Sequence, residues 1–260
     1  MTRARVSVCV ITLNEEHRLC DCLQSVPFAD ELIVVDSHST DATRDIAEAA
    51  GARVIERDWP GHIEQKNFAI DQATHDWVLC LDADERLSDE LQQSVLAALE
   101  RDDPPAGFTC NRRTHYLGRW IDHGGWYPDR KLRLFRRSGG RWGGVNPHDH
   151  VHLEGTVEHL RGDLLHYSYD SIADHLNTIN LFTTIAAREK HKRGGRGSLV
   201  SLLLRPGWKF LRMYVFRAGF LDGRAGLIVA LLGSYYVFLK YAKLTELSRG
   251  WISARDDRRG

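Results

Sequence analysis

The chain has 260 residues, of which 43% are hydrophobic and 27% are charged, so it can bury a core and is not intrinsically disordered. Its 35 basic and 35 acidic side chains cancel, which argues against a nucleic-acid-binding protein with a basic coat. The cancellation hides a division, because residues 1–102 carry 9 basic and 21 acidic side chains whereas residues 103–260 carry 26 and 14. This asymmetry predicts two different functional surfaces.

The cysteines and the apolar runs indicate where in the cell the protein is located. The five cysteines are odd in number and include no Cys-x-x-Cys pair, which argues against a disulfide framework and a zinc ribbon. The first apolar run, about seven residues, is too short for a signal peptide. The longest apolar stretch, 225–239, is shorter than the ~20 residues that a spanning helix needs. The sequence therefore predicts a cytoplasmic protein that attaches to a membrane at most peripherally.

The first hundred residues alternate between short apolar strands and helices. We expect strands at 6–12, 31–36, 53–56 and 77–82, and helices at 14–25, 40–51, 62–73 and 89–100. Ser39 or Thr40 would cap the second helix and Ser88 the fourth. Continuous apolar strands between helices predict a parallel sheet covered on both faces. Neither a GxGxxG nor a GxxxxGK[ST] motif is present, which argues against a dinucleotide dehydrogenase and a P-loop enzyme.

Polar clusters follow three of these strands, at 12–15, 36–39 and 82–85. Ligands of parallel sheets bind at the carboxyl ends of the strands, so the clusters should converge on one edge. Asp82 and Asp84 flank a single residue there, and two such carboxylates can share Mg²⁺ or Mn²⁺ with substrate phosphates. Each cluster alone could equally cap a turn or a helix. Their convergence favours a binding site.

Four segments (10–16, 32–41, 65–67 and 77–85) together resemble family 2 glycosyltransferases of the GT-A fold. Four later segments (125–129, 133–135, 148–151 and 219–223) narrow the resemblance to the lipopolysaccharide-core β-1,4-glucosyltransferase subgroup. The resemblance covers about residues 5–248 and implies an α/β fold. The implied parts are a nucleotide-sugar-binding half (1–105), an antiparallel acceptor-side half (106–168) and a basic, aromatic-rich C-terminal helical extension at the membrane surface (169–260).

The resemblance implies inverting transfer of a sugar, with glucose favoured, from a nucleoside-diphosphate sugar such as UDP-glucose to a hydroxyl of lipopolysaccharide core or a related glycolipid. Mg²⁺ or Mn²⁺ would stabilise the departing diphosphate, with Asp84 as its main ligand and Asp82 contacting ribose or metal-bound water. Lys66 would lie near the diphosphate, although an exposed helix lysine is an equal alternative. The residues implied to bind the nucleotide sugar are Thr12, Asn14, Glu15, Asp36, Lys66, Asp82 and Ala83.

Inversion requires one general base opposite the leaving group. The candidate is Asp149, with His148 orienting it or the acceptor, at a place where the subgroup usually has His-Glu. Because His148, His150 and His152 would share one face of a strand, a zinc site is an alternative, as is a plain polar strand.

The back half of the chain predicts the acceptor side and a membrane surface. Short strands are expected at 108–116, 119–123, 131–136, 150–153 and 164–167, broken by glycine pairs at 124–125, 139–140 and 143–144. A helix is expected at 172–191. The following segment, 188–224, has ten basic and two acidic residues among many leucines and aromatics, which favours an anionic membrane surface over a purely structural helical cap.

Two other functions stay open. A polyprenyl-phosphate sugar synthase would share the front half of the chain, and a non-catalytic membrane-bound module could bind nucleotide sugar without transferring it. The aromatic and arginine residues of the acceptor side could also bind single-stranded nucleic acid, but the metal and nucleotide clusters make such a partner unfavourable. The preferred location is cytoplasmic, at the inner face of the cell membrane.

Overall fold

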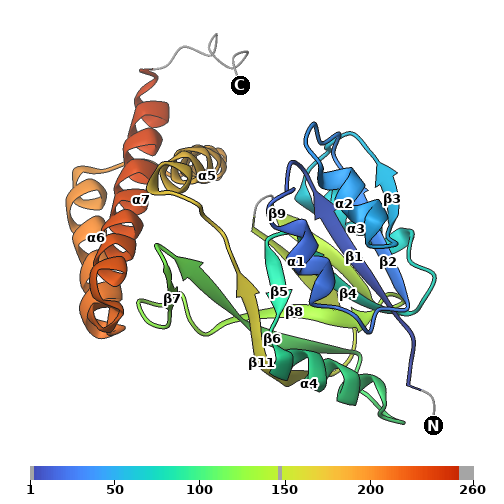
Figure 1. Ribbon diagram of the computed structural model, residues 1–260. Coiled ribbons are helices and arrows are strands. Elements are labelled where there is room, and N and C mark those ends of the chain that lie inside the picture. Colours follow the sequence, from blue (N-terminus) through green and yellow to red (C-terminus); the bar gives the residue numbers. More distant parts are fainter. Residues whose placement is uncertain (1–2, 146–147, 252–260) are drawn as a thin grey trace. The chain divides into compact units, whose positions relative to one another are not determined.

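The computed structural model describes residues 3–145 and 148–251, without the side chains of Val145 and His148. The chain forms two compact units. The first contains Met1–Arg113 and Pro128–Tyr167, and the second contains Thr114–Tyr127 and Ser168–Gly260. Each unit is described separately below (Figure 1).

The first unit is built on the predicted parallel sheet. The strands β1 (Val6–Thr12), β2 (Glu31–Asp36), β3 (Arg53–Glu56) and β4 (Trp77–Asp82) lie in the order β3-β2-β1-β4. Thr12 pairs with Asp36 and Ile11 pairs with Asp82 in the parallel register. The three strands therefore end at one edge, which confirms the expected convergence of the polar clusters.

Antiparallel strands extend this sheet beyond β4. β8 (Asp129–Arg136) pairs with β4 and then with β6 (Gly107–Tyr116), and β11 (Val157–His166) and β5 (Glu85–Leu87) complete the order. The last residues of β6 and the short β7 (Arg119–Ile121) belong to the second unit. The segments 1–105 and 106–168 thus share one continuous sheet.

Two hydrophobic cores cover the two faces of the sheet. Val6, Val8 and Val10 point into one core, and the alternate residues Cys9 and Ile11 point into the other. The first core is covered by α1 (Leu19–Gln24), α2 (Thr43–Ala49) and α4 (Asp89–Leu99), whose N-cap is Ser88 as predicted. The second is covered by α3 (His62–Asp71) and by a hairpin of β9 (Gly140–Val145) and β10 (His148–Leu153).

Two local expectations were wrong. Ser39 and Thr40 do not cap α2, because Ser39 binds Asp36 and the N-cap position is Ala42. The glycine pairs at 139–140 and 143–144 do not all break strands, because β9 runs from Gly140 to Val145. A Cβ atom at Gly140 would lie 2.4 Å from the Phe135 ring, so glycine lets β9 approach its neighbours.

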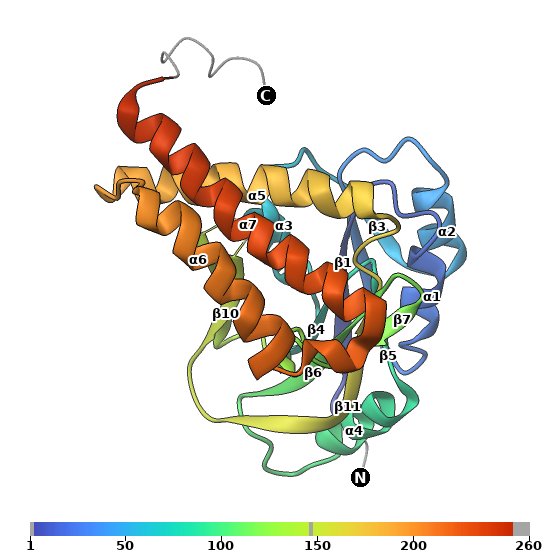
Figure 2. The same ribbon diagram turned by 90° about the vertical axis from the view of Figure 1, so that its left-hand side faces the viewer.

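The second unit is mainly helical (Figure 2). Its long helices are α5 (Ile172–Lys192), as predicted, α6 (Leu199–Leu211) and α7 (Gly223–Arg249). A π-helical turn, η1 (Arg212–Phe216), and a 3-10 turn, η2 (Gly219–Asp222), connect α6 to α7. Tyr116 and Ile121 pack with Met213 and Val229 in one core, and Ala187, Tyr241 and Leu244 form a second.

The chain contains a candidate membrane span that the sequence analysis did not predict. Within the described residues, the helical stretch Gly219–Arg249 is long and apolar enough to cross a membrane by length and composition alone. The continuous apolar run 225–239 underestimates this stretch, because the helix continues past Lys240 to Arg249 and a span can include a few charged residues.

Candidate active site

Lys66 joins two predicted site residues that are far apart in the sequence. Its ammonium Nζ lies 3.0 Å from Asp82 Oδ1 at the end of β4 and 2.8 Å from Asp149 Oδ2 in β10. The Lys66 side chain is only 8% exposed, so the alternative of an exposed helix lysine was wrong. Lys66 therefore holds the predicted base and the carboxylate at the end of β4 together.

The neighbours of Lys66 on α3 explain why its side chain faces this cluster. Asn67 makes two hydrogen bonds to the Trp142 backbone, donating to its carbonyl (2.9 Å) and accepting from its amide (3.0 Å). This pair fixes β9 against α3, and the antiparallel register places Asp149 opposite Gly144. Gln65 donates to Ser37 Oγ, which ties the other side of α3 to the loop after β2.

Arg133 is a second buried cation beside Asp82. It donates to Asp82 Oδ2 at 3.1 Å and to Glu85, a fully buried carboxylate. Burial alone would raise the pKa of Asp82, but Lys66 and Arg133 outweigh burial and hold this pKa far below its usual range. Burial alone would lower the pKa of Lys66, but Asp82 and Asp149 outweigh it and raise this pKa. Asp82, Lys66 and Arg133 are therefore charged at neutral pH.

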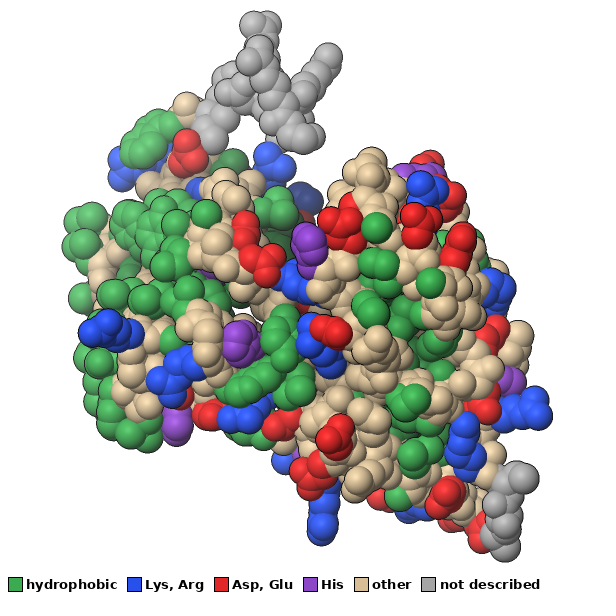
Figure 3. Space-filling view, viewed as in Figure 1, with side chains coloured by type: hydrophobic (Ala, Val, Ile, Leu, Met, Phe, Trp, Pro, Cys, Tyr) green, Lys and Arg blue, Asp and Glu red, His purple; other side chains and the backbone are tan. Residues whose placement is uncertain are grey.

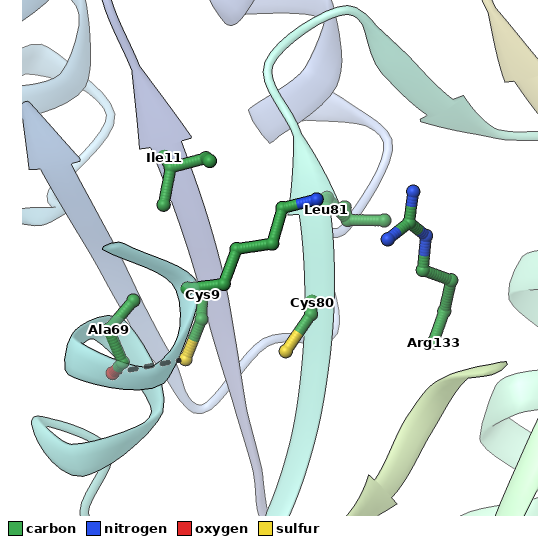
Figure 4. Close-up of a pocket in the computed structure, with 7 residues that line it drawn as sticks. Cys9, Ile11, Ala69, Cys80, Leu81 and Arg133 are labelled. Carbon is green, nitrogen blue, oxygen red and sulfur yellow. Dashed lines mark hydrogen bonds between the residues drawn. The ribbon is translucent and has the colours of Figure 1, made fainter. Parts of the chain in front are cut away.

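An apolar floor lies beneath the two cations. Lys66 Nζ stands 4.4 Å from the centroid of the Trp142 ring, and the Arg133 guanidinium carbon stands 5.4 Å from it. Lys66 and Arg133 also border a gap that has no room for a water molecule. Figure 4 shows Cys9 and Cys80 on neighbouring strands at the bottom of this gap. The ion pairs are thus screened little from this side.

Asp36 organises the adjoining loops. Its carboxylate accepts hydrogen bonds from Thr12 Oγ1 (3.0 Å), from the Ser39 amide (2.7 Å) and from Ser39 Oγ. Asp36 has no exposed surface, and its hydrogen-bond partners here are Thr12 and Ser39. A contact of Asp36 with a base or ribose stays a prediction. Asn14 accepts from the Thr40 amide at 2.9 Å and has a positive φ of 54°.

The remaining predicted residues lie along the same edge. The Glu15 amide donates to Thr43 Oγ1 and the Glu15 carboxylate lies 3.5 Å from Arg18. Ala83 is buried. The backbone of His148 opens β10, but its side chain lies outside the described part of the structure. Across the described residues there is no group of three or more His, Cys, Asp or Glu side chains that could hold a metal. The zinc alternative stays a prediction, because it includes the side chain of His148.

The structure pairs Asp84 with a residue that the sequence analysis missed. His166, at the end of β11, lies with Nε2 3.2 Å from Asp84 Oδ2. Both side chains are partly accessible, at 12% for His166 and 19% for Asp84. Arg133 and Glu85 lie within the segments 133–135 and 82–85 that the sequence analysis singled out, and no sequence signal marked His166. The carboxylate and imidazole form a candidate pair of metal ligands.

Comparison with protein families matches residues 7–152 to Glycosyl transferase family 2. The chain belongs to this family. The Lys66, Asp82 and Asp149 cluster lies within the matched part of this glycosyltransferase.

Curated relatives extend the similarity to nearly the whole length of the glycosyltransferase. The lipopolysaccharide core biosynthesis glycosyltransferase LpsC of Rhizobium meliloti is 32% identical over 93% of this chain and 92% of its own. An uncharacterized glycosyltransferase of Rickettsia typhi is 32% identical over 94% and 88%. Both similarities therefore include the helical second unit.

A solved structure supports the fold of the glycosyltransferase. The mannosyltransferase PcManGT of Pyrobaculum calidifontis matches 94% of this chain and 88% of its own, with a TM-score of 0.54 and 16% identity. The GT-A-like α/β fold with a C-terminal helical extension is confirmed.

Proposed function

We propose that this family 2 glycosyltransferase transfers a sugar, with inversion, from a nucleoside-diphosphate sugar to a hydroxyl of lipopolysaccharide core or a related glycolipid. UDP-glucose is the favoured donor, as the subgroup resemblance implies. The similarity to a glycosyltransferase of lipopolysaccharide core biosynthesis, over nearly the full length of both chains, supports the acceptor class.

One observation carries the chemistry, namely that a single buried ammonium contacts both Asp82 and Asp149. Asp82 ends β4 at the edge where parallel sheets bind nucleotides, so Lys66 is within reach of a diphosphate bound there. Asp149 is the carboxylate that accepts the proton of the attacking hydroxyl, and Lys66 then moves toward the charge that develops on the leaving diphosphate. One base is sufficient for inversion, because no nucleophilic carboxylate is needed.

Asp84 and His166 fit a divalent metal better than Asp82 does. Asp82 is already bound by Lys66 and Arg133, whereas Asp84 and His166 present one oxygen and one nitrogen ligand on a partly accessible surface. Few protein ligands are typical where substrate phosphates complete the coordination of Mg²⁺ or Mn²⁺. When bound, the metal would supply positive charge to the diphosphate. Mn²⁺ is present in the solved complex of the Pyrobaculum mannosyltransferase with GDP-Man.

The remaining assignments belong to the same proposal. Thr12, Asn14, Glu15 and Ala83 border the nucleotide sugar, since they lie at or just after the ends of β1 and β4. His148 orients the base or the acceptor. The transferase works in the cytoplasm at the inner face of the cell membrane, because its acceptor is a lipid.

The test is release of nucleoside diphosphate from a panel of nucleotide sugars, with Mn²⁺ or Mg²⁺ and a lipopolysaccharide-core acceptor. We expect acceptor-dependent release, fastest with UDP-glucose, and loss of release in excess EDTA. Transfer to polyprenyl phosphate alone would identify a polyprenyl-phosphate sugar synthase. Binding of donor with no release under any condition would leave a non-catalytic module.

A further inference from the structure

The outward face of α6 is apolar along its whole length. The exposed side chains of this face are 45% to 71% accessible, although a helix of a water-soluble domain normally turns such residues inward. Figure 3 shows hydrophobic side chains gathered over this part of the second unit. The residues of the α6 face are Leu199, Val200, Leu203, Leu204, Trp208 and Leu211.

The basic residues of α6 lie on its other side, against α7. Arg205 donates to Tyr241 Oη at 2.8 Å and stands over the Tyr241 ring. Lys209 is half-buried near Gly233, and burial, with Arg212, Arg217 and Lys240 nearby, lowers its pKa. These two side chains therefore stabilise the packing of α6 on α7, while Arg205 keeps an exposed surface.

The apolar face continues beyond α6 and has a basic edge. Arg212, Arg217 and Arg224 are exposed around the turn between α6 and α7. Asp222, the only acidic residue in 199–224, is 1% exposed and accepts hydrogen bonds from His123. The exposed apolar residues of the continuation are Val215, Phe216, Phe220, Leu221, Leu227 and Leu231.

We propose that α6 and the turn after it lie in the interface of a lipid bilayer, with the α6 face buried among the acyl chains and the arginines of the turn at the lipid phosphates. Twelve exposed apolar residues spread over 199–231, together with exposed charge of one sign only, fit an anionic bilayer better than a protein partner. This inference takes from the proposed function only that the acceptor is a lipid. The α6 face is then the surface that brings the enzyme to that acceptor.

α7 lies along the bilayer in this arrangement and does not cross it. Lys243 of α7 donates to Asn180, Thr183 and Thr184 of α5, so polar side chains cover one side of α7. Spanning would carry these groups into the hydrocarbon, where each costs free energy. The candidate span Gly219–Arg249 is thus accounted for by a helix that contacts lipid on one side only.

Cosedimentation of the full chain with vesicles tests the surface. Wild type should bind vesicles with added phosphatidylglycerol more tightly than pure phosphatidylcholine vesicles, because the exposed arginines are attracted to anionic lipid. About 0.5 M salt should weaken this binding without abolishing it, because apolar burial is not screened. The triple variant Leu203→Ser, Leu204→Ser, Trp208→Ser should lose at least about tenfold in partition coefficient. A control with Trp59→Ser and Val157→Ser, which are exposed in the first unit, should bind like wild type.

Three results would overturn this proposal. The triple variant could bind like wild type, wild type could bind anionic vesicles alone and leave them in salt, or wild type could fail to bind vesicles and form a dimer that the triple variant abolishes.

Circular dichroism of the triple variant checks its fold. Transfer to a water-soluble core oligosaccharide without its lipid reports the proposed function separately, because it should be equal in wild type and the triple variant. Its absence from wild type would contradict the function and leave the vesicle result interpretable.

Discussion

At the scale of single residues, the three aspartates of the site have different roles. Asp82, Asp84 and Asp149 have different partners, namely two cations, a histidine and one lysine respectively. Three substitutions that keep side-chain size separate these roles.

Asp149→Asn removes the proton acceptor and keeps the shape. We expect turnover on the acceptor to fall by about 10²–10⁴-fold, whereas donor affinity stays near normal, because loss of a general base affects the transition state. Steady-state kinetics together with donor titration by calorimetry measure both. The exposed Glu154, replaced by Gln, is the matched control. Near-normal turnover in Asp149→Asn, or loss of turnover in the control, would show that the base lies elsewhere.

Asp84→Asn and Asp82→Asn should differ in what they damage. Asp84→Asn should weaken Mn²⁺ binding at least about tenfold with little loss of stability, and His166→Ala should do the same. Asp82→Asn should destabilise the fold by about 3 kcal/mol, because Lys66 and Arg133 lose a buried partner. Urea unfolding and manganese titration monitored by electron paramagnetic resonance distinguish the two. Unchanged Mn²⁺ affinity in both Asp84→Asn and His166→Ala would remove the metal assignment.

At the scale of elements, α5 carries a buried histidine in an aromatic cluster. His175 stacks on Tyr169 with a centroid distance of 4.3 Å and shares a 2.9 Å hydrogen bond with Tyr116 Oη. Burial lowers the pKa of His175 from 6.5 to about 4. The folded chain therefore keeps this imidazole neutral under conditions that protonate it in the unfolded chain.

This shift predicts a loss of stability in acid. Between pH 6.5 and about 4, His175 is protonated in the unfolded state but stays neutral in the folded state. The free energy of unfolding therefore falls as pH falls. The loss attributable to His175 approaches about 3 kcal/mol at the acid end. His175→Gln should be less stable at neutral pH but should lose less over this window, as measured by urea unfolding at several pH values. Parallel pH profiles for the two proteins would contradict the assignment.

At the scale of the whole molecule, two compact units with separate cores predict separable stability. Leu244 is fully buried in a core made only by the second unit. Leu244→Ala should destabilise that unit by about 2–5 kcal/mol through loss of burial and the cavity left behind. Hydrogen exchange should then rise in α5 and α7 and stay unchanged in β1–β4, with donor affinity preserved. Equal loss of protection in both units would mean that the chain unfolds as one cooperative block.

The local pattern of the sequence determined the elements of the first unit and the edge where their polar ends meet. Apolar continuity over 6–12, 31–36 and 77–82 identifies buried parallel strands, and parallel strands between helices bring their carboxyl ends to one edge whatever the rest of the chain does. The motifs at that edge were sufficient to predict the family. Strand ends and the α2 cap were less predictable, because a side chain such as Ser39 can bind either its own helix or a neighbouring loop.

Only the tertiary structure decided which distant residues meet. The contact of Lys66 with Asp149 depends on Asn67 fixing β9 against α3, and the contact of Asp84 with His166 depends on the pairing of β11 with β5. Likewise, composition marked 188–224 as basic and aromatic, but the packing of α6 on α7 decided that Arg205 faces Tyr241 and Trp208 faces outward. The physical reason is the same in each case. The sequence encodes the period of a helix or strand locally, but the neighbour that covers each face is selected by contacts across the whole fold.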